Sequence, residues 1–293
     1  MNRKYKNITE SQITWFCENY PNNGARFCSE QLNLPIPYLH RIAMEKSLNV
    51  DKKTNSLITS QAMRKFSIGK EEKYFKSALD ISINSPEIAY TLGFLWGDGY
   101  LSHRKNSLCY YPVVGIVKED FLDIFDSFKH IGSWKTYSVS VKNGIEQVRA
   151  YLHNNKWGYF LRKNDYINKS SASPYKILSL IPDALKKYWW RGYSDADGCF
   201  YIHVSRKIVQ FCFCGSYDQD WSETKNLFNK LGIEKYSIKL SNKNNQKGSI
   251  IRVSNYRDIK KFGDFIYSNR IDIGLKRKME KFSQINILSA SIA

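Results

Sequence analysis

Hydrophobic residues near the start of the chain recur at the spacing of a helix. The pattern predicts three short helices, over about residues 9–20, 25–32 and 37–48. Pro21-Asn22-Asn23-Gly24 separates the first two helices, and Asn33-Leu34-Pro35 makes a tight turn before the third. Residues 1–50 are therefore predicted to form a small all-α module. The periodicity weakens over residues 51–84, where lysines and arginines predict a basic linker that either follows a phosphate backbone or is simply solvated.

Two later stretches combine apolar and small residues in the same way. Residues 91–99 and 189–198 are rich in apolar and aromatic side chains, and both end on Asp-Gly. Each carries two small residues four positions apart, which share one face of a helix. Two helices with such faces can pack closely against each other. The small residues are Gly93 and Gly97 in the first stretch and Gly192 and Ala196 in the second.

Each stretch predicts a helix that ends at an aspartate, Asp98 or Asp197, with Gly99 or Gly198 as a left-handed cap. A carboxylate at a helix C-terminus opposes the helix dipole at a cost of about 0.3–1 kcal/mol. Two neighbouring carboxylates also repel each other. A single Asp-Gly usually marks a turn, but two copies 99 residues apart favour a paired site that a divalent cation would stabilise.

The elements that follow the two stretches have the same order. After the first, strands are predicted around 100–102, 110–117, 134–142 and 146–152, with helices from 118 and over 156–163. After the second, strands are predicted at 199–204, 209–214, 236–241 and 249–254, with helices over 220–231 and 256–267. The chain therefore predicts an α+β fold of two pseudo-symmetric halves, residues 85–170 and 171–293.

Two detailed matches support the duplication. Tyr137-Ser138-Val139 matches Tyr236-Ser237-Ile238, and Arg149 matches Arg252. Residues 270–293 predict either a last helix packed on the second half or a frayed basic tail.

The charge of the chain indicates its partner. A net charge of +18 and a pI near 9.5 favour a polyanion, nucleic acid before membrane. No run of apolar residues is long enough for a membrane span. The helix order of the N-terminal module resembles a helix-turn-helix, in which the third helix would present Tyr38, His40, Arg41 and Lys46 to DNA. A generic three-helix cap with a charged outer face is the alternative.

The six cysteines form no Cys-x-x-Cys motif, which favours a reducing, intracellular compartment such as a bacterial or phage-infected cytoplasm or an organelle. Cys212 and Cys214 lie in an alternating run and are predicted to be buried strand thiols rather than metal ligands.

The two Asp-Gly stretches resemble the signature of a known protein family. Tyr193-Ser194-Asp195-Ala196-Asp197-Gly198, and more loosely Leu92-Gly93-Phe94-Leu95-Trp96-Gly97-Asp98-Gly99, resemble the signature of monomeric, two-repeat LAGLIDADG homing endonucleases. The resemblance implies two αββαββα repeats whose saddle-shaped antiparallel sheets lie across double-stranded DNA. It also implies site-specific cleavage of both strands at a long target, leaving 3′ overhangs. Trp96 stands where the signature has its earlier acidic residue.

The resemblance further implies the cofactor and its ligands. Mg²⁺ would bind at Asp98 and Asp197, with Gly97 and Ala196 at the same helix ends; Mn²⁺ would substitute, and Ca²⁺ would bind without supporting cleavage. A polar residue near the end of the second strand assists in the family, which indicates Lys118 in the first repeat and Ser216 or Gln210 in the second. A basic residue near the fourth strand indicates Arg149 and Arg252.

Contacts to DNA are expected at alternate, exposed positions of the strands and in their turns. In the first repeat these are Ser102, His103, Arg104, Lys135, Ser138, Ser140 and Lys142. In the second they are His203, Ser205, Arg206, Lys207, Ser237, Lys239, Ser241, Lys243 and Lys247.

A non-cutting descendant that binds DNA or RNA, as a transcription regulator or an intron-splicing maturase, is the alternative function. Two retained, mutually repelling carboxylates favour cutting.

Overall fold

The computed structural model describes residues 8–61, 76, 78, 80–103, 110–140, 146–206, 208–243, 246–268 and 273–290. The chain divides into two compact units, Met1–Lys73 and Tyr74–Ala293. The C-terminal part of the predicted linker belongs to the second unit, because Ala78 and Ile83 are buried in its core.

The first unit is helical, as predicted. Helix α1 (Glu10–Leu32) begins with a capping box in which Thr9 and Gln12 exchange hydrogen bonds. The predicted break lies at Gly24, whose φ of 76° and ψ of 173° interrupt the helical geometry. Helix α2 (Ile36–Glu45) follows, and residues 52–61 are also helical. The small core of this unit consists of Phe16, Tyr20, Cys28, Leu39, Ile42 and Ala43.

The second unit contains the two predicted repeats. The first comprises α4 (Pro86–Gly97), β1 (Gly99–His103), β2 (Tyr110–Val117), α5 (Lys118–Lys129), β3 (Trp134–Ser140), β4 (Glu146–Leu152) and α6 (Asn155–Lys163). A short helix, α7 (Tyr175–Leu180), connects it to the second repeat. The second comprises α8 (Asp183–Asp197), β5 (Gly198–His203), β6 (Ile208–Gly215), α9 (Ser222–Lys230), β7 (Tyr236–Lys243), β8 (Gln246–Val253) and α10 (Tyr256–Tyr267).

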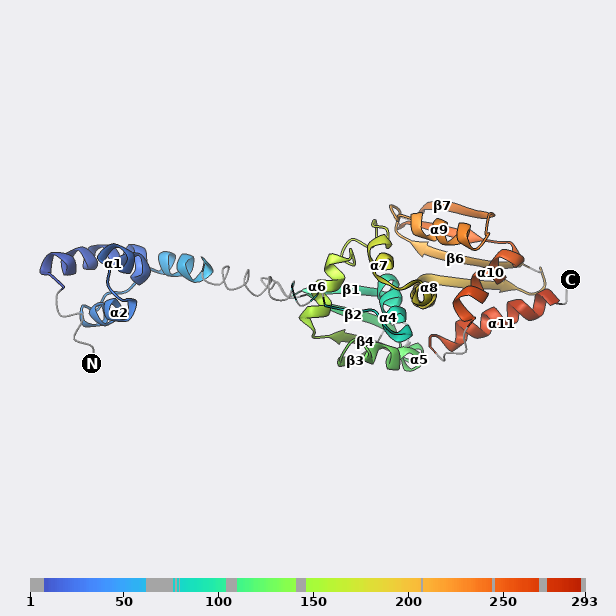
Figure 1. The fold of residues 1–293 in the computed structure, drawn as a ribbon, viewed down its shortest axis with the longest axis horizontal. Helices are drawn as coiled ribbons and strands as arrows, with labels where there is room; N and C mark the ends of the chain where they lie inside the picture. Colours follow the sequence, from blue (N-terminus) through green and yellow to red (C-terminus); the bar gives the residue numbers. More distant parts are fainter. Residues whose placement is uncertain are drawn as a thin grey trace. The chain divides into compact units, whose positions relative to one another are not determined.

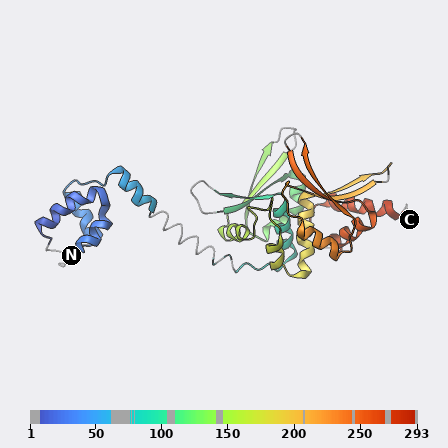
Figure 2. The same ribbon diagram turned by 90° about the horizontal axis from the view of Figure 1, so that it is seen from above.

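Each repeat folds its four strands into one antiparallel sheet with the same topology. The orders are β1-β2-β4-β3 and β5-β6-β8-β7. Figures 1 and 2 show α4 and α8 side by side at the centre of this unit, with one sheet on each side. The prediction of an α+β fold with two αββαββα repeats is therefore confirmed.

Strand pairing defines which residues of the two repeats are equivalent. Starting from the glycine that follows each central helix, successive partners can be traced across each sheet. The partners run Gly99–Val114–Ala150–Thr136 in the first sheet and Gly198–Phe213–Ile251–Ile238 in the second.

This pairing corrects the expected equivalences in the last two strands. Arg252 corresponds to Tyr151, two positions beyond Arg149, so the two arginines are not equivalent. The match of Tyr137 with Tyr236 is also wrong, by three positions. Because side chains alternate with a period of two, the shift of two residues at Arg149 leaves the apolar pattern unchanged, and the pattern alone does not reveal it. The shift of three residues at Tyr137 instead exchanges the two faces of the strand.

The cysteines of β6 also differ from the prediction. Phe211 and Phe213 are fully buried, whereas Cys212 is half-buried and Cys214 is exposed. The strand therefore turns its aromatic residues to the core, because a phenylalanine ring removes more apolar surface from water than a thiol does.

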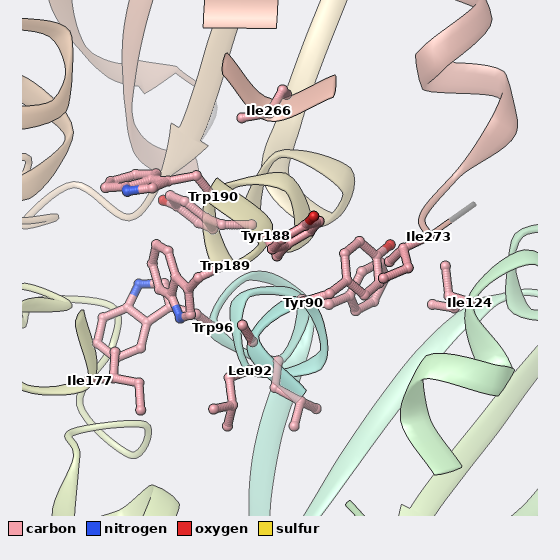
Figure 3. Packing of buried hydrophobic residues seen from close by; sticks show 14 of the residues in the cluster. Tyr90, Leu92, Trp96, Ile124, Ile177, Tyr188, Trp189, Trp190, Ile266 and Ile273 are labelled. Atoms are coloured by element: carbon pink, nitrogen blue, oxygen red, sulfur yellow. The ribbon is translucent and has the colours of Figure 1, made fainter. Parts of the chain in front are cut away.

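The core of the second unit surrounds the two central helices. Figure 3 shows Trp96 from one helix against Trp189 from the other, with ring centroids 6.2 Å apart, and Tyr90 on the opposite side of the interface. The chain ends in α11 (Lys276–Ala290), which buries Phe282 and Ile285, so the last segment is a packed helix. Across the described ranges, no helix combines the length and apolar character that a membrane span needs.

Candidate active site

The helices α4 and α8 approach each other through positions without side chains. A Cβ atom on Gly93 would collide with a backbone carbonyl oxygen of α8, and one on Gly192 would collide with a carbonyl oxygen of α4. Glycine permits this approach because it has no Cβ. At the C-terminal end, the methyl group of Ala196 fills the space that a side chain on Gly97 would need. All four small residues predicted for the interface lie in it.

Asp98 and Asp197 end their helices, but the glycines that follow are not left-handed caps. Gly198 has extended geometry, with φ −80° and ψ 148°, and Gly99 is the first residue of β1. Glycine is needed here for space. A Cβ on Gly99 would lie 2.7 Å from a carbonyl oxygen one turn back in α4, and one on Gly198 would lie 2.5 Å from the corresponding oxygen of α8. Each Asp-Gly therefore leads its helix directly into the first strand of a sheet.

The two carboxylates interact at the C-terminal end of this interface, where Asp98 is exposed and Asp197 is half-buried. Partial loss of hydration in the crowded helix end raises the pKa of Asp98, while Lys278 and Lys169 act in the opposite direction. The same effect raises the pKa of Asp197 to about 6, and the charge of Asp98 contributes to the increase. The Oδ2 atom of Asp197 lies 3.1 Å from the Cβ position of Gly97, at the end of the other helix. Ionisation of both carboxylates is therefore unfavourable, and a bound cation would offset their mutual repulsion.

Two lysine ammonium groups cap the carbonyl ends of the paired helices. Lys169, in the loop after α6, donates to two carbonyl oxygens at the end of α4. Lys278, in α11, donates to four at the end of α8, over 2.5–3.5 Å. Burial lowers the pKa of Lys169 to about 8, against the effect of Asp197 and Asp98, and burial lowers the pKa of Lys278. Each ammonium satisfies carbonyls that helix geometry leaves unpaired and places positive charge at the negative end of the dipole.

The sequence did not indicate either lysine as part of the site. Lys169 lies in a polar loop that has no periodic pattern. Lys278 is one of several cations of the C-terminal segment, but it shares a helix face with Phe282 and Ile285. A lysine in the apolar stripe of a helix is a signal that could have identified it as buried.

Each lysine is held in place by the opposite repeat. The backbone carbonyl of Lys169 accepts a hydrogen bond from Nε2 of Gln219, which precedes α9. Next to Lys278, Arg277 forms two hydrogen bonds of 2.7 and 2.6 Å with the carboxylate of Asp120 in α5. Such bidentate pairs fix geometry as well as charge. Each capping lysine therefore lies in a segment that contacts the opposite repeat.

Asp195, the earlier acidic residue of the second motif, has a different role. Its side chain is buried, and its Oδ2 atom accepts hydrogen bonds of 2.9 Å from the Tyr90 hydroxyl and from the backbone N–H of Leu275. Leu275 immediately precedes α11. Asp195 therefore anchors the helix that carries Lys278, which is a structural role.

The donor set at the helix ends fits a divalent cation that prefers oxygen ligands. Asp98 and Asp197 supply two adjacent carboxylates. The carbonyl oxygens of Gly97 and Ala196, also predicted as part of the metal site, accept hydrogen bonds from the two lysines. Within the described part of the chain, His, Cys, Asp and Glu side chains form no cluster of three or more suited to a metal. Two carboxylates suffice for Mg²⁺, which usually retains water and binds substrate phosphates.

The predicted assisting residues have different local partners in the structure. Lys118 forms an exposed ion pair of 2.8 Å with Glu146. Arg149 is exposed on β4, where the Tyr137 hydroxyl is its hydrogen-bond partner. Arg252 is half-buried on β8 and lies opposite Cys212.

Ser216 and Gln210, the two alternatives for the assisting residue of the second repeat, have different surroundings. The hydroxyl of Ser216 donates to the carbonyl oxygen of Ser170, in the loop that carries Lys169. Gln210 lies half-buried in β6, opposite Tyr201.

In the first sheet, the predicted DNA contacts fall on two faces. Lys135 pairs with Tyr151, which lies on the face turned away from the core, and Ser102 shares that face. Ser138 pairs with Val148, which is buried, so it lies on the other face. His103 is exposed at the end of β1. Arg104, Lys142 and the side chain of Ser140 lie outside the described residues.

The exposed face of this sheet also carries an aromatic cavity of about 300 Å³. Three of its rings meet closely, since His153 lies 5.0 Å from both Tyr111 and Tyr151, measured between centroids. The cavity is lined by Tyr100, Ser102, Tyr111, Val113, Tyr137, Tyr151 and His153.

In the second sheet, the predicted contacts of β5 and β7 share the face turned away from the core. They are His203, Ser237, Lys239 and Ser241, on the face that also carries Cys212. Ser205 and Arg206 are exposed in the turn after β5. Lys247 lies on the opposite face, with its ammonium 5.9 Å from the ring centroid of Tyr217. Lys207 and the side chain of Lys243 lie outside the described residues.

The DNA contacts predicted for the first unit lie in α2 or at its C-terminal end. His40, Arg41 and Lys46 are exposed, and the Arg41 guanidinium lies 5.1 Å from the ring centroid of Tyr38. The His40 Nδ1 atom lies 3.4 Å from the hydroxyl of Tyr20, which orients the ring. The outer face of this helix is therefore polar and accessible within its unit.

Comparison with known proteins identifies one sequence relative and several structures. No family model matches the chain. An uncharacterized protein of Methanocaldococcus jannaschii is 25% identical over 222 residues, which cover 69% of this chain and 72% of the relative.

Similar solved structures include a LAGLIDADG meganuclease and a homing endonuclease. I-AabMI bound to uncleaved DNA is 17% identical, with 71% of this chain and 91% of that chain covered and a TM-score of 0.45. I-WcaI bound to its DNA recognition sequence is 18% identical, with 71% and 91% covered and a TM-score of 0.48. I-SmaMI bound to an uncleaved DNA target with calcium ions is 17% identical, with 71% and 92% covered and a TM-score of 0.46. The chain is thus similar in structure to LAGLIDADG homing endonucleases.

Proposed function

We propose that the chain is a metal-dependent, site-specific endonuclease that hydrolyses both strands of double-stranded DNA. The observation that carries this proposal is the meeting of Asp98 and Asp197 from two halves of the chain, at the C-terminal ends of two closely packed helices. Each carboxylate opposes its helix dipole, and partial loss of hydration raises the pKa of both. A protein that only binds DNA has no need of such an arrangement.

The cation is expected to be Mg²⁺, held by Asp98 and Asp197, with Mn²⁺ as a substitute and Ca²⁺ as a ligand that does not support cleavage. A divalent cation here supplies an activated water and stabilises negative charge on the attacked phosphate. Residues of the chain position the carboxylates and offset charge. Lys169 and Lys278 hold the helix ends, and with them the carboxylates, at a fixed separation. Their ammonium groups also offset charge that develops on a phosphate close to the helix ends.

The exposed faces of the two sheets are the proposed DNA-binding surface. Antiparallel strands fit the major groove, where side chains reach base edges. Lys135 in one sheet and Lys239 in the other lie on these faces, and the chain as a whole carries a net charge of +18. Contacts to phosphates would supply much of the affinity and make it fall with rising salt concentration. The first unit, through α2, would extend the contact to a long target, bound by a monomer.

The pseudo-symmetry of the site accounts for cutting of two strands. One carboxylate comes from each repeat, and each repeat carries its own sheet and its own capping lysine. Each half would serve one DNA strand. The two cuts are expected to be staggered and to leave 3′ overhangs.

The direct test uses the DNA into which the gene would insert. A duplex that carries the rejoined locus without the insert is incubated with the protein in Mg²⁺ or in EDTA, and the ends are mapped. The proposal expects a single double-strand break, in Mg²⁺ only. Tight binding of this duplex without cleavage would instead favour a transcription regulator or a maturase.

A further inference from the structure

Three thiols lie together on the exposed face of the second sheet. Cys199 and Cys212 occupy directly opposed positions of β5 and β6, and Cys214 is the next residue of β6 on the same face. Cys199 and Cys214 are exposed and Cys212 is half-buried. The Cys212 thiol interacts with the thiols of both neighbours. In the equivalent positions, the first sheet has Tyr100, Val113 and Gly115, so this cluster is not a requirement of the fold.

The opposed pair has the spacing that a disulfide needs. Directly opposed residues of an antiparallel pair have Cβ atoms about 4.5–5.5 Å apart. A disulfide requires about 3.5–4.5 Å, so a small movement of two strands is sufficient. Cys212 and Cys214 are a less suitable pair, since residues two apart along a strand have Cα atoms about 6.6 Å apart, near the upper limit for a disulfide.

The cluster is close to the candidate active site. Cys199 is the second residue after Asp197, in the strand that leaves the end of α8. Asp197 also acts electrostatically on Cys214. A bond that draws β5 towards β6 at Cys199 would therefore move the segment that positions Asp197. Displacement of a catalytic group by about 1 Å can lower a rate by about 100-fold.

We propose that Cys199 and Cys212 form a redox-sensitive dithiol, whose oxidation to a disulfide switches off DNA cleavage. With hydrogen peroxide as oxidant, one thiol sulfur attacks the peroxide and becomes a sulfenic acid as one water leaves. The second thiol sulfur then attacks the sulfenic sulfur, the S–S bond forms and a second water leaves. The two thiols lose two electrons in total and the peroxide gains them. A dithiol reductant reverses the change. The effect on cleavage rests on the proposed function, whereas the disulfide itself does not.

The test measures the bond and the activity separately in the full chain. Protein treated with peroxide is alkylated, digested with trypsin without reduction and analysed by mass spectrometry. Arg206 and Lys207 separate Cys199 from Cys212, so the bond joins two tryptic peptides. We expect this linked pair to appear and the rate of cleavage to fall at least tenfold, with recovery in dithiothreitol.

Two variants provide matched controls. Cys199→Ser should give no linked peptide, and peroxide should leave its activity at its own untreated level. Cys214→Ser should still form the bond and still lose activity on oxidation.

The absence of the Cys199–Cys212 bond, or its formation without loss of cleavage, would overturn the proposal, as would equal loss of activity in Cys199→Ser. If reduced protein does not cleave DNA, the proposed nuclease function fails, and the linked peptide still decides whether the dithiol exists.

Discussion

Replacement of Asp197 by asparagine should stabilise the metal-free protein at neutral pH. The wild-type carboxylate is half-buried beside Asp98, and partial loss of hydration together with the charge of Asp98 raises its pKa from 3.8 to about 6. Asparagine has nearly the same shape but no charge, so it removes both the cost of burying the anion and the repulsion from its neighbour. The residue proposed as a metal ligand is thus expected to reduce the stability of the fold.

The size of the effect follows from the pKa change. A pKa of about 6 in the folded protein against 3.8 in the unfolded chain corresponds to about 3 kcal/mol, at 1.36 kcal/mol for each pKa unit. This is an upper value, because the asparagine amide must also find hydrogen-bond partners. We therefore expect Asp197→Asn to raise the free energy of unfolding by about 1–3 kcal/mol at pH 7.5.

The pH dependence gives the effect a distinctive signature. The pKa of the wild-type carboxyl group is raised on folding, so its contribution to stability is fully present below about pH 4 and is lost as the pH rises through about 6. The advantage of the variant should therefore be small at pH 4, grow between pH 4 and 6, and remain constant above that range.

Urea denaturation in EDTA at several pH values measures this effect, with Asp218→Asn, at an exposed aspartate, as the matched control. Addition of Mg²⁺ should stabilise the wild type and have a smaller effect on Asp197→Asn. If the variant is less stable than the wild type at pH 7.5, or is changed equally at pH 4 and pH 7.5, the charge of Asp197 does not destabilise the fold.

Of three further predictions, two concern the residues around the carboxylates and one concerns the N-terminal module. Lys278→Met should lower the free energy of unfolding by about 1–3 kcal/mol and reduce cleavage, because it leaves helix-end carbonyls without a donor. Lys281 is exposed on the same helix, so Lys281→Met should change neither quantity. Equal effects of the two substitutions would contradict the capping role of Lys278. Gly192→Ala should lower the free energy of unfolding by about 3 kcal/mol or more, because the added Cβ would collide with a carbonyl of α4. Gly115→Ala is the control in the same denaturation series, because a Cβ there meets no atom within 4 Å. Deletion of residues 1–50 should weaken binding and shorten the DNase footprint at one end only; an unchanged footprint would remove the DNA role of this module.

The fold was predictable because the same pattern of elements occurs twice in the sequence. The two Asp-Gly stretches lie 99 residues apart, and the strands and helices that follow each have the same order. Either half alone would have predicted a sheet with helices, but only the repetition indicated that two helices pair. Gly93 and Gly192 then predicted the close contact, and Asp98 and Asp197 predicted the charged end, because both depend on local spacing.

What the sequence did not predict depends on contacts between distant segments. Lys169 and Lys278 cap the helices α4 and α8 from positions more than 70 residues away along the chain, and no local pattern marks such a contact. The conformations of Gly99 and Gly198 were also mispredicted. An Asp-Gly pair is compatible with a left-handed cap and with a direct entry into a strand, and only the packing against the preceding turn requires the second.

The strand register failed for a different reason. Arg149 and Arg252 were matched across a hairpin whose length differs between the repeats, and an alternating pattern does not distinguish shifts of two residues. Long-range pairing, rather than local propensity, decides which residue lies beside the site.

The cleavage rate of the Asp98→Asn, Asp197→Asn double variant decides whether the two carboxylates form the catalytic centre. It would be compared with the wild-type rate on the same duplex in Mg²⁺, with binding of that duplex measured in parallel. Loss of both carboxylates should lower the cleavage rate by about 1,000-fold or more and leave DNA affinity within about tenfold of the wild type, because metal-assisted hydrolysis and groove binding use different groups. Cleavage by the double variant within tenfold of the wild-type rate would contradict the assignment of Asp98 and Asp197 as the catalytic centre.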